Sequence, residues 1–278
     1  MILKRNFSMW FCFIRTLCLV AFLATAFYSC ENKSSKNVGT QTNNDNNPKD
    51  DINPKDDNNP KDDNDPKAEN NPNLEKLTVT ISGSISHTIY GKTEKGEVSF
   101  NRFPVSVREF KEVRDKIGKE PHGAVALQIM AYEMYRRNKE IGLECIKLNN
   151  TTNNISSATS RLDELFGKDE KYARPYQMAA YLKGATWDNG YKPDKPYKVE
   201  IEVNKATPYQ YTETYQSDML FLDILTEGKP SSKDVVWVIK THKPGEPSEG
   251  KYFIVNNCPN IYSQVRAISF ATPFEGLD

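Results

Sequence analysis

Three histidines are the side chains best suited to acid–base chemistry in this 278-residue chain, and their settings favour structural roles. His87 alternates with two isoleucines on a predicted strand face, which is typical of a half-buried histidine. His122 follows a proline at a predicted helix start, where the positive end of the helix dipole disfavours a charged imidazole. His242 ends a predicted strand beside a Pro-Gly turn and is expected to face water. A structural role is therefore the favoured interpretation for each.

Two cysteines, Cys145 and Cys258, are the candidate nucleophiles of the region that we expect to fold. Cys145 lies on an apolar helical stripe, which is a setting that raises a thiol pKa and lowers its reactivity. In an oxidising compartment the two cysteines could form a disulfide that closes a long loop. They could equally remain separate buried thiols, and the sequence leaves both alternatives open.

The chain contains none of the short motifs that mark zinc proteases, nucleophile elbows, phosphate loops, dinucleotide loops or clustered cysteine sites. The carboxylate-rich run at residues 161–172 is typical of a solvated surface. We therefore expect a protein that is not an enzyme, with no catalytic residue, no metal site and no cofactor.

Residues 181–197 combine aromatic side chains with short polar ones. Aromatic faces stack on sugars or peptides, while carboxylates and carboxamides bond their polar groups. The segment therefore predicts a binding site for an unidentified glycan, peptide or protein. Alternatively, the aromatic rings fill a junction between the last helix and the sheet, and the polar residues form turns. The candidate binding residues are Tyr181, Trp187, Asp188, Asn189, Tyr191 and Tyr197.

The first 29 residues have the pattern of a lipoprotein signal peptide. Basic residues precede a 13-residue apolar run, 16–28, which is too short to span a bilayer comfortably. The run ends at Ser29-Cys30, which resembles the bacterial site where a cysteine is lipidated. We expect a lipid at Cys30 that anchors the chain to the outer membrane in the cell envelope. The alternatives are an ordinary signal peptide and an uncleaved anchor.

Residues 30–73 begin with the expected lipidated cysteine, and residues 47–73 form a six-residue repeat of the type NPKDDN. Prolines stand at positions 48, 54, 60, 66 and 72, and they block helix formation. The repeat contains almost no apolar side chains and therefore lacks the means to form a core. We interpret it as a disordered tether with a mean reach of roughly 35–40 Å, which lifts residues 74–278 off the membrane.

The charge of the chain gives no indication of nucleic-acid binding. The full sequence has 37 basic and 37 acidic residues, and removal of the predicted signal peptide leaves 34 basic and 37 acidic residues. Nucleic-acid binding proteins usually present a strongly basic face. We expect no nucleic-acid partner. The expected partners are the membrane, through the lipid at Cys30, and the unidentified ligand of residues 181–197.

Residues 74–278 show helical periodicity in their first half. Ser106 and Glu109 form a predicted capping box, and Gly118 ends that helix. Residues 123–137 are apolar almost all round, which is typical of a helix at the centre of a domain. The predicted helices cover 106–118, 123–137, 139–148, 160–166 and 175–182.

Strand patterns lie on both sides of these helices. A Gly83-Ser84 turn is expected to join the first two strands as a tight hairpin. Short connections between the later strands favour antiparallel pairing. We predict a single α+β domain whose helices pack on one face of an antiparallel, curved sheet with cone-like topology. The predicted strands are 76–82, 85–90, 96–100, 197–203, 219–225, 235–241 and 251–255.

Three stretches resemble an uncharacterised family of bacterial lipoproteins and related envelope or secreted proteins, over about residues 104–258. They are EPHGAVALQIMAYEMYRRNKEIGLECIKLNN, YLKGATWDNGYKPDKPYKVEIEV and GKYFIVNN. The chain departs from that family in a polar insertion, NNTTNNISS, and in Tyr252-Phe253 where a tryptophan is expected. The resemblance implies a domain of unknown function and supplies no catalytic residue.

These observations favour a tethered envelope lipoprotein whose domain binds a ligand or has a structural role. A hydrolase-like enzyme with a site assembled from distant residues is a second reading, which a histidine in an open cleft beside a carboxylate would support. A periplasmic accessory subunit of a surface complex is a third, which an exposed apolar patch would support.

Overall fold

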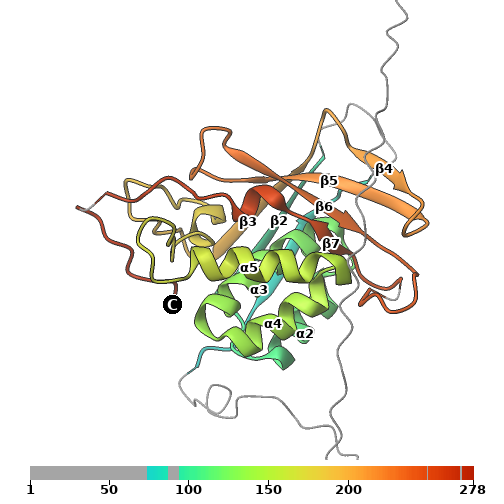
Figure 1. Cartoon of the computed structure of the whole chain (residues 1–278), viewed down its shortest axis with the longest axis horizontal. Helices are drawn as coiled ribbons and strands as arrows, with labels where there is room; N and C mark the ends of the chain where they lie inside the picture. Colours follow the sequence, from blue (N-terminus) through green and yellow to red (C-terminus); the bar gives the residue numbers. More distant parts are fainter. Residues whose placement is uncertain (1–73, 87–93, 249, 270) are drawn as a thin grey trace, which may run out of the picture. The chain divides into compact units, whose positions relative to one another are not determined.

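A computed structural model describes residues 74–86, 94–248, 250–269 and 271–278 of the chain (Figure 1). The predicted signal peptide, the lipid site at Cys30, the tether and His87 lie outside the described residues. Among the described residues, no helix is both long and apolar enough to cross a membrane.

In the part of the chain that the structure describes, seven antiparallel strands form one open sheet (Figure 1). The strand order is β1-β2-β3-β5-β6-β7, and β4 pairs with the part of β5 that β3 leaves free. The strands are β1 (Val79–Gly83), β2 (Lys95–Phe100), β3 (Tyr197–Val203), β4 (Tyr209–Thr212), β5 (Ser217–Leu225), β6 (Lys233–Ile239) and β7 (Ile254–Asn257). The sheet is not closed into a barrel, and the predicted α+β single domain is confirmed.

Alternation along β3 explains why one face of the sheet is covered. Tyr197, Val199 and Ile201 are buried on the inner face, while the residues between them are charged and half-exposed. Side chains of a strand point alternately to its two faces, so this pattern turns an apolar row toward the helices. The inner row becomes part of the core.

Among the described residues, four helices lie on the inner side of this sheet (Figure 1). The helix α3 lies at the centre, in contact with the other three helices and with most of the strands. Its residues from Pro121 to Tyr135 are all buried, as the apolar sequence predicts. The helices are α2 (Val107–Ile117), α3 (Pro121–Arg137), α4 (Lys139–Asn149) and α5 (Ile155–Leu165), with single 3₁₀ turns at Thr152–Asn154, Ala179–Tyr181 and Pro259–Tyr262.

A carboxylate on the central helix is neutralised within the same helix. Glu133 is fully buried, and its Oε1 accepts hydrogen bonds from Arg136 at 2.6 Å and Arg137 at 2.9 Å. Buried charges are tolerated only when they are paired, so the two arginines allow the end of α3 to stay in the core.

The predicted helix start at Ser106 is confirmed, because its hydroxyl accepts a hydrogen bond from the Glu109 amide at 3.2 Å. The tight hairpin at Gly83-Ser84 is wrong: β1 pairs directly with β2, and residues 84–94 connect them. The predicted helix at 175–182 forms only the 3₁₀ turn Ala179–Tyr181. The short strand β4 is absent from the sequence prediction, because its exposed polar pattern resembles a loop.

Candidate functional site

The segment at residues 181–197 lies beneath the last part of the chain, residues 265–269 and 271–278, which we call the C-terminal strap. The strap is attached along its length. The Arg266 amide donates to the Gly228 carbonyl at 2.8 Å, and the Thr272 hydroxyl donates to the Asp188 carbonyl at 3.0 Å. The strap has no helix or strand of its own, so its position depends on these contacts.

Tyr181 lies in the core at the start of this segment, with 1 % of its surface exposed. Its hydroxyl donates to Asp234 at 2.6 Å, and the Lys229 ammonium bonds the same carboxylate. Burial, and then the neighbouring carboxylate, raise the pKa of Tyr181 well above its usual value. Tyr181 therefore offers no surface to a ligand.

Tyr191 and Tyr197 hold the strap in place. The Tyr191 ring stacks on Tyr176, with centroids 5.1 Å apart, and its hydroxyl donates to the Arg266 carbonyl at 2.7 Å. The Tyr197 hydroxyl donates to Asp278 at 2.6 Å. Both rings are buried, and burial raises the pKa of each phenol. The strap and the sheet cover these two rings and that of Tyr181, so none of the three has an exposed face on which a ligand could stack; their burial agrees with the alternative interpretation, in which the aromatic rings fill a junction.

Asn189 organises the turn that follows Trp187. Its carbonyl oxygen accepts from the amides of Thr186 and Lys192, and its amide nitrogen donates to the Gly184 carbonyl at 2.7 Å. The carboxamide is therefore used within its own turn, as the alternative interpretation of this segment proposed.

The same turn meets the strap at Gly190. This glycine has φ +70°, and a Cβ there would lie 2.7 Å from the Thr272 carbonyl oxygen. Tyr191 also has a positive φ, 54°, which is unusual for a bulky residue. Such a conformation persists only where the surrounding structure imposes it, and the stacked ring and the strap do so here.

Trp187 and Asp188 remain at the surface of the segment. Trp187 is half-buried, and the Arg266 guanidinium lies 3.5 Å from the centroid of its ring. Asp188 is exposed, and a hydrogen bond from Thr186 lowers the pKa of its carboxyl, so it is ionised at neutral pH. Asn189 is exposed as well, but its carboxamide is used within its own turn, so Trp187 and Asp188 are the members of the predicted set whose side chains remain available to a ligand.

A groove of about 500 Å³ separates the turn from the strap. Residues 188–192 form one wall and residues 271–276 form the other. Lys192 and Glu275 face each other across it at 3.4 Å, and both are exposed. The size falls within the range of small-ligand sites in proteins.

The cysteines form no disulfide. Cys145 is buried on α4, and burial raises the pKa of its thiol. Cys258 is also buried, with its sulfur 3.3 Å from the hydroxyls of Tyr132 and Tyr262, and burial raises its pKa to about 11. The alternative of two separate buried thiols is therefore the one that the structure has, and both are poor nucleophiles at neutral pH.

The histidines that the structure describes are not in a catalytic arrangement. His122 is fully buried against Gly96, neither ring nitrogen has a hydrogen-bond partner, and burial lowers the pKa of its imidazole. His242 is exposed, as expected. Within the described ranges, no group of three or more histidine, cysteine or acidic side chains is arranged to hold a metal ion.

A second hollow, of about 340 Å³, lies at the end of α5 and is absent from the sequence prediction. Tyr172, Pro259 and Tyr262 contribute to its walls, and we call it the tyrosine pocket. Tyr172 belongs to the charged run that we interpreted as a solvated surface, and its partners are about 90 positions away. No local pattern in the sequence connects residues so far apart.

The chain was compared with known protein families, curated proteins and solved structures. Residues 102–269, more than half of the chain, match the family described as Domain of unknown function (DUF6935). The chain belongs to this family. No curated protein and no solved structure matches it. The predicted membership of a domain-of-unknown-function family is thus confirmed, with limits slightly wider than the expected 104–258.

Proposed function

We propose that this DUF6935 protein is a bacterial envelope lipoprotein whose folded domain binds a ligand without chemical conversion. The proposal combines the sequence pattern of residues 1–73 with the groove beside Asp188. The lipid at Cys30 anchors the chain to the outer membrane, and the tether gives the domain freedom to search for its ligand.

The groove between residues 188–192 and 271–276 is the observation that carries the binding function. Its floor is rigid, because buried tyrosines and the Asn189 turn hold both walls. Its rim carries one ionised carboxylate, Asp188, and the exposed Lys192–Glu275 pair. Charged hydrogen-bonding groups beside aromatic rings suit a polar ligand such as an oligosaccharide.

Catalysis receives less support from the described residues. A nucleophile needs an adjacent base and access to substrate. Cys145, Cys258 and His122 are all buried, and none lines the groove. Binding is therefore the function that the site supports best.

A role as an accessory subunit is favoured by a different surface. Met219, Phe221, Trp237 and their neighbours form an apolar cluster, separate from the main core, on the face of β5 and β6 opposite the inner row. Trp237 in this cluster is only partly buried. Aromatic side chains of this kind are enriched at protein interfaces.

The anchoring is tested by metabolic labelling with a palmitate analogue in a bacterial host. The wild-type chain should incorporate the label, and Cys30→Ala should not. The control Cys145→Ala should be labelled like the wild type. Labelling that survives the loss of Cys30 would overturn the anchoring proposal.

The binding function is tested by screening the purified protein against an oligosaccharide array and measuring hits by calorimetry. Asp188→Ala should weaken binding at least tenfold, with a nearly unchanged melting temperature, because the side chain is exposed. The matched control is Asp169→Ala, an exposed carboxylate outside the groove. Equal affinities of the two variants would exclude the groove as the binding site. If a protein partner were then found to bind the apolar cluster on β5 and β6, the accessory role would be favoured.

A further inference from the structure

The carboxylate of Asp278 lies among donors from three separate parts of the chain. Its Oδ1 accepts hydrogen bonds from the Tyr197 hydroxyl at 2.6 Å and from the Lys195 ammonium at 3.0 Å. Its Oδ2 accepts a hydrogen bond from the Phe103 amide at 3.2 Å and lies 3.7 Å from Nη2 of Arg137. Four donors therefore converge on one carboxylate, and we call this set of donors the carboxylate site.

The core holds the walls of the carboxylate site. Phe103 and Tyr197 are buried, and the centroids of their rings are 5.5 Å apart. The Arg137 guanidinium lies 4.9 Å from the centroid of the Phe103 ring and donates to the buried Glu133 at 2.9 Å. None of these contacts involves the C-terminal strap, so we expect the donors to keep their positions when the occupant of the site changes.

The chemistry of the site favours an anionic acceptor. Its phenol hydroxyl is buried, and a buried hydroxyl needs a hydrogen-bond partner. Arg136 and Arg137 share the carboxylate of Glu133, and Lys195 adds a third positive charge. The basic groups thus outnumber the one acidic partner that the site has besides Asp278. A carboxylate that enters the site gains charge-assisted hydrogen bonds, which are stronger than neutral ones.

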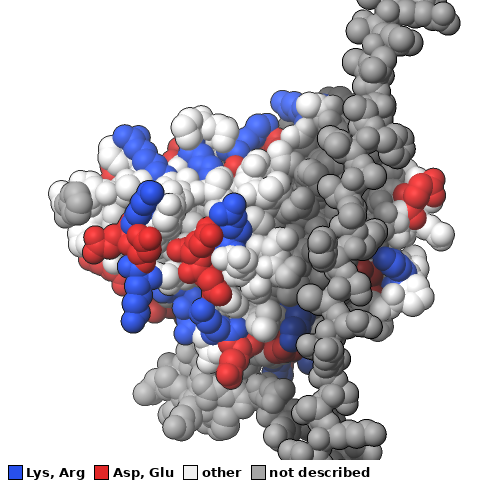
Figure 2. Space-filling view, in the orientation of Figure 1, with Lys and Arg blue, Asp and Glu red and all other residues white. Residues whose placement is uncertain are grey.

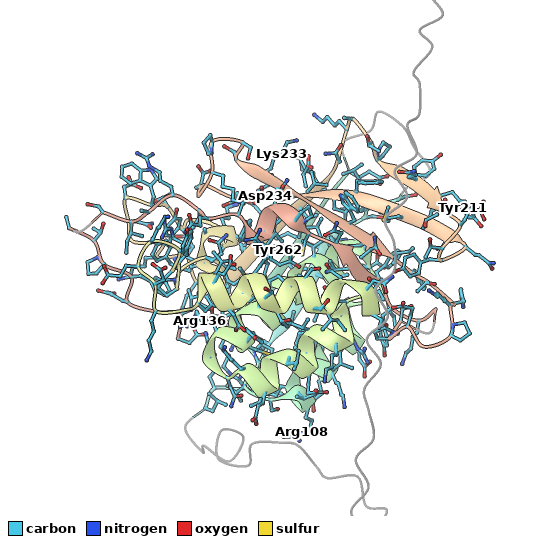
Figure 3. The ribbon with its side chains drawn as sticks, in the orientation of Figure 1. Arg108, Arg136, Tyr211, Lys233, Asp234 and Tyr262 are labelled. Carbon is cyan, nitrogen blue, oxygen red and sulfur yellow. The ribbon has the colours of Figure 1, made fainter. Side chains whose placement is uncertain are left out.

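The carboxylate site lies at the surface, beside the end of α3. Figure 1 marks the end of the chain on this side, Figure 2 shows basic and acidic side chains interspersed there, and Figure 3 labels Arg136 nearby. The side chains of Lys195 and Asp278 are 62 % and 20 % exposed. A carboxylate from another molecule can therefore approach the donors from solvent.

The present occupant consists of Leu277 and Asp278. Leu277 is buried, and its carbonyl accepts a hydrogen bond from Arg137 at 2.6 Å. Gly276, which precedes them, has φ +100° and open space where a Cβ would stand. A glycine in such surroundings allows the two residues to move independently of the rest of the strap. The site thus holds an apolar side chain followed by a carboxylate.

We propose that the carboxylate site is a docking site for an acidic peptide of a partner protein, and that Leu277-Asp278 is a built-in competitor for it. The bound pair shows which chemistry fits: the donors take the carboxylate, and the buried position of Leu277 takes the preceding apolar side chain. A peptide with the same two features would form the same contacts and displace the end of the strap.

The competitor sets the threshold for docking. A segment joined to its own site through a short flexible connection has an effective concentration on the order of millimolar. A free peptide must exceed this competition, so the strap acts as an autoinhibitory contact. The carboxylate site shares no residue with the groove beside Asp188, and the proposal is independent of an oligosaccharide ligand.

A peptide titration of the purified full-length chain, followed by NMR, tests the proposal. The probe is acetyl-Gly-Leu-Asp-Gly-amide, and the reporter is the Phe103 amide, which donates to the carboxylate. The double variant Leu277→Ser/Asp278→Ala lacks the competitor and should bind the probe about tenfold more tightly than the wild type. The matched control is Ala267→Ser, at an exposed position of the strap away from the site, which should bind like the wild type.

Two further titrations separate recognition of the carboxylate from general loosening of the strap. A probe with asparagine in place of aspartate should bind the double variant about tenfold more weakly, because it lacks the charge. Adding the exposed Lys195→Ala to that variant should also weaken binding. Should the double variant not fold, the single variant Asp278→Asn takes its place, with a smaller gain in affinity.

Three outcomes would overturn the proposal. The first is equal affinity of the aspartate and asparagine probes. The second is equal affinity of the wild type and the variants that lack the Asp278 carboxylate. The third is a Phe103 amide that does not shift in these variants at peptide concentrations above the millimolar range.

Discussion

The segment at 181–197 and the tyrosine pocket both combine aromatic rings with charges, yet they differ in what the chain itself covers. In the segment, the C-terminal strap and the sheet bury Tyr181, Tyr191 and Tyr197. In the pocket, Tyr172 stays exposed, although its backbone is held by Gln264. A sequence rich in aromatic residues therefore indicates rings that can stack. Whether those rings are buried or available to a ligand depends on the segments that pack over them in the tertiary structure.

The largest effect that separates the two regions is expected at Tyr191. Tyr191→Ala should lower the free energy of unfolding by about 3–5 kcal/mol, because it removes a buried ring that stacks on Tyr176 and leaves a cavity. Urea denaturation followed by tryptophan fluorescence measures the loss. Tyr191→Phe, which keeps the ring, should lose only about 1 kcal/mol. A loss below 1 kcal/mol for the alanine variant would mean that the ring is dispensable.

The anchor of the strap at Asp278 should be sensitive to acid. Burial alone would raise the pKa of this carboxyl, but hydrogen bonds from Tyr197 and Lys195 outweigh it and lower the pKa below the usual 3.8. A folded-state pKa below the unfolded one means that the carboxylate stabilises the fold above about pH 4 and that this contribution is lost as the pH falls further.

The measurement compares the free energy of unfolding at pH 6 and pH 3 in the wild type and in Asp278→Asn. The wild type should lose about 1 kcal/mol more than the variant, which is the scale of a partly screened hydrogen bond to a charged group. Asp169→Asn serves as the exposed control. Parallel losses in the wild type and Asp278→Asn would show that the strap is held by its apolar contacts.

The loss of stability expected on substitution of Trp187 lies between the losses expected at Tyr191 and at Tyr172. Trp187→Ala should cost about 1 kcal/mol, because the ring is half-buried and its contact with the exposed Arg266 is worth on the order of 0.5–1 kcal/mol. A double-mutant cycle with Arg266→Ala isolates that contact by thermal or urea unfolding. A loss above 3 kcal/mol would place Trp187 with the buried tyrosines and remove it from the set available to a ligand.

Tyr172 should show the smallest effect on stability. Tyr172→Ala is expected to change the free energy of unfolding by less than about 0.5 kcal/mol, because the ring is exposed and its loop is fixed through backbone carbonyls. The same urea assay applies, with Tyr211→Ala as control. A loss comparable to that of Tyr191→Ala would mean that the ring supports the fold and is not reserved for a ligand.

The sequence alone determined the α+β class, the central helix and the capped start at Ser106. These features follow from local chemistry, since a helix that is apolar all round must be buried and a serine before an apolar stripe caps it. The family match extends over this same part of the chain. The alternation of β3 and the apolar runs of β5 and β6 made these strands predictable from local sequence as well.

Only the tertiary structure decided which aromatic rings face solvent. The strap that covers Tyr191 has no periodic pattern, and its contacts with residues 186–197 join positions about 80 apart in the chain. The separation of the two free thiols and the meeting of Tyr172 with Tyr262 depend on the same long-range packing. The sequence states the type of each side chain, but the exposure of that side chain depends on which other parts of the chain pack against it.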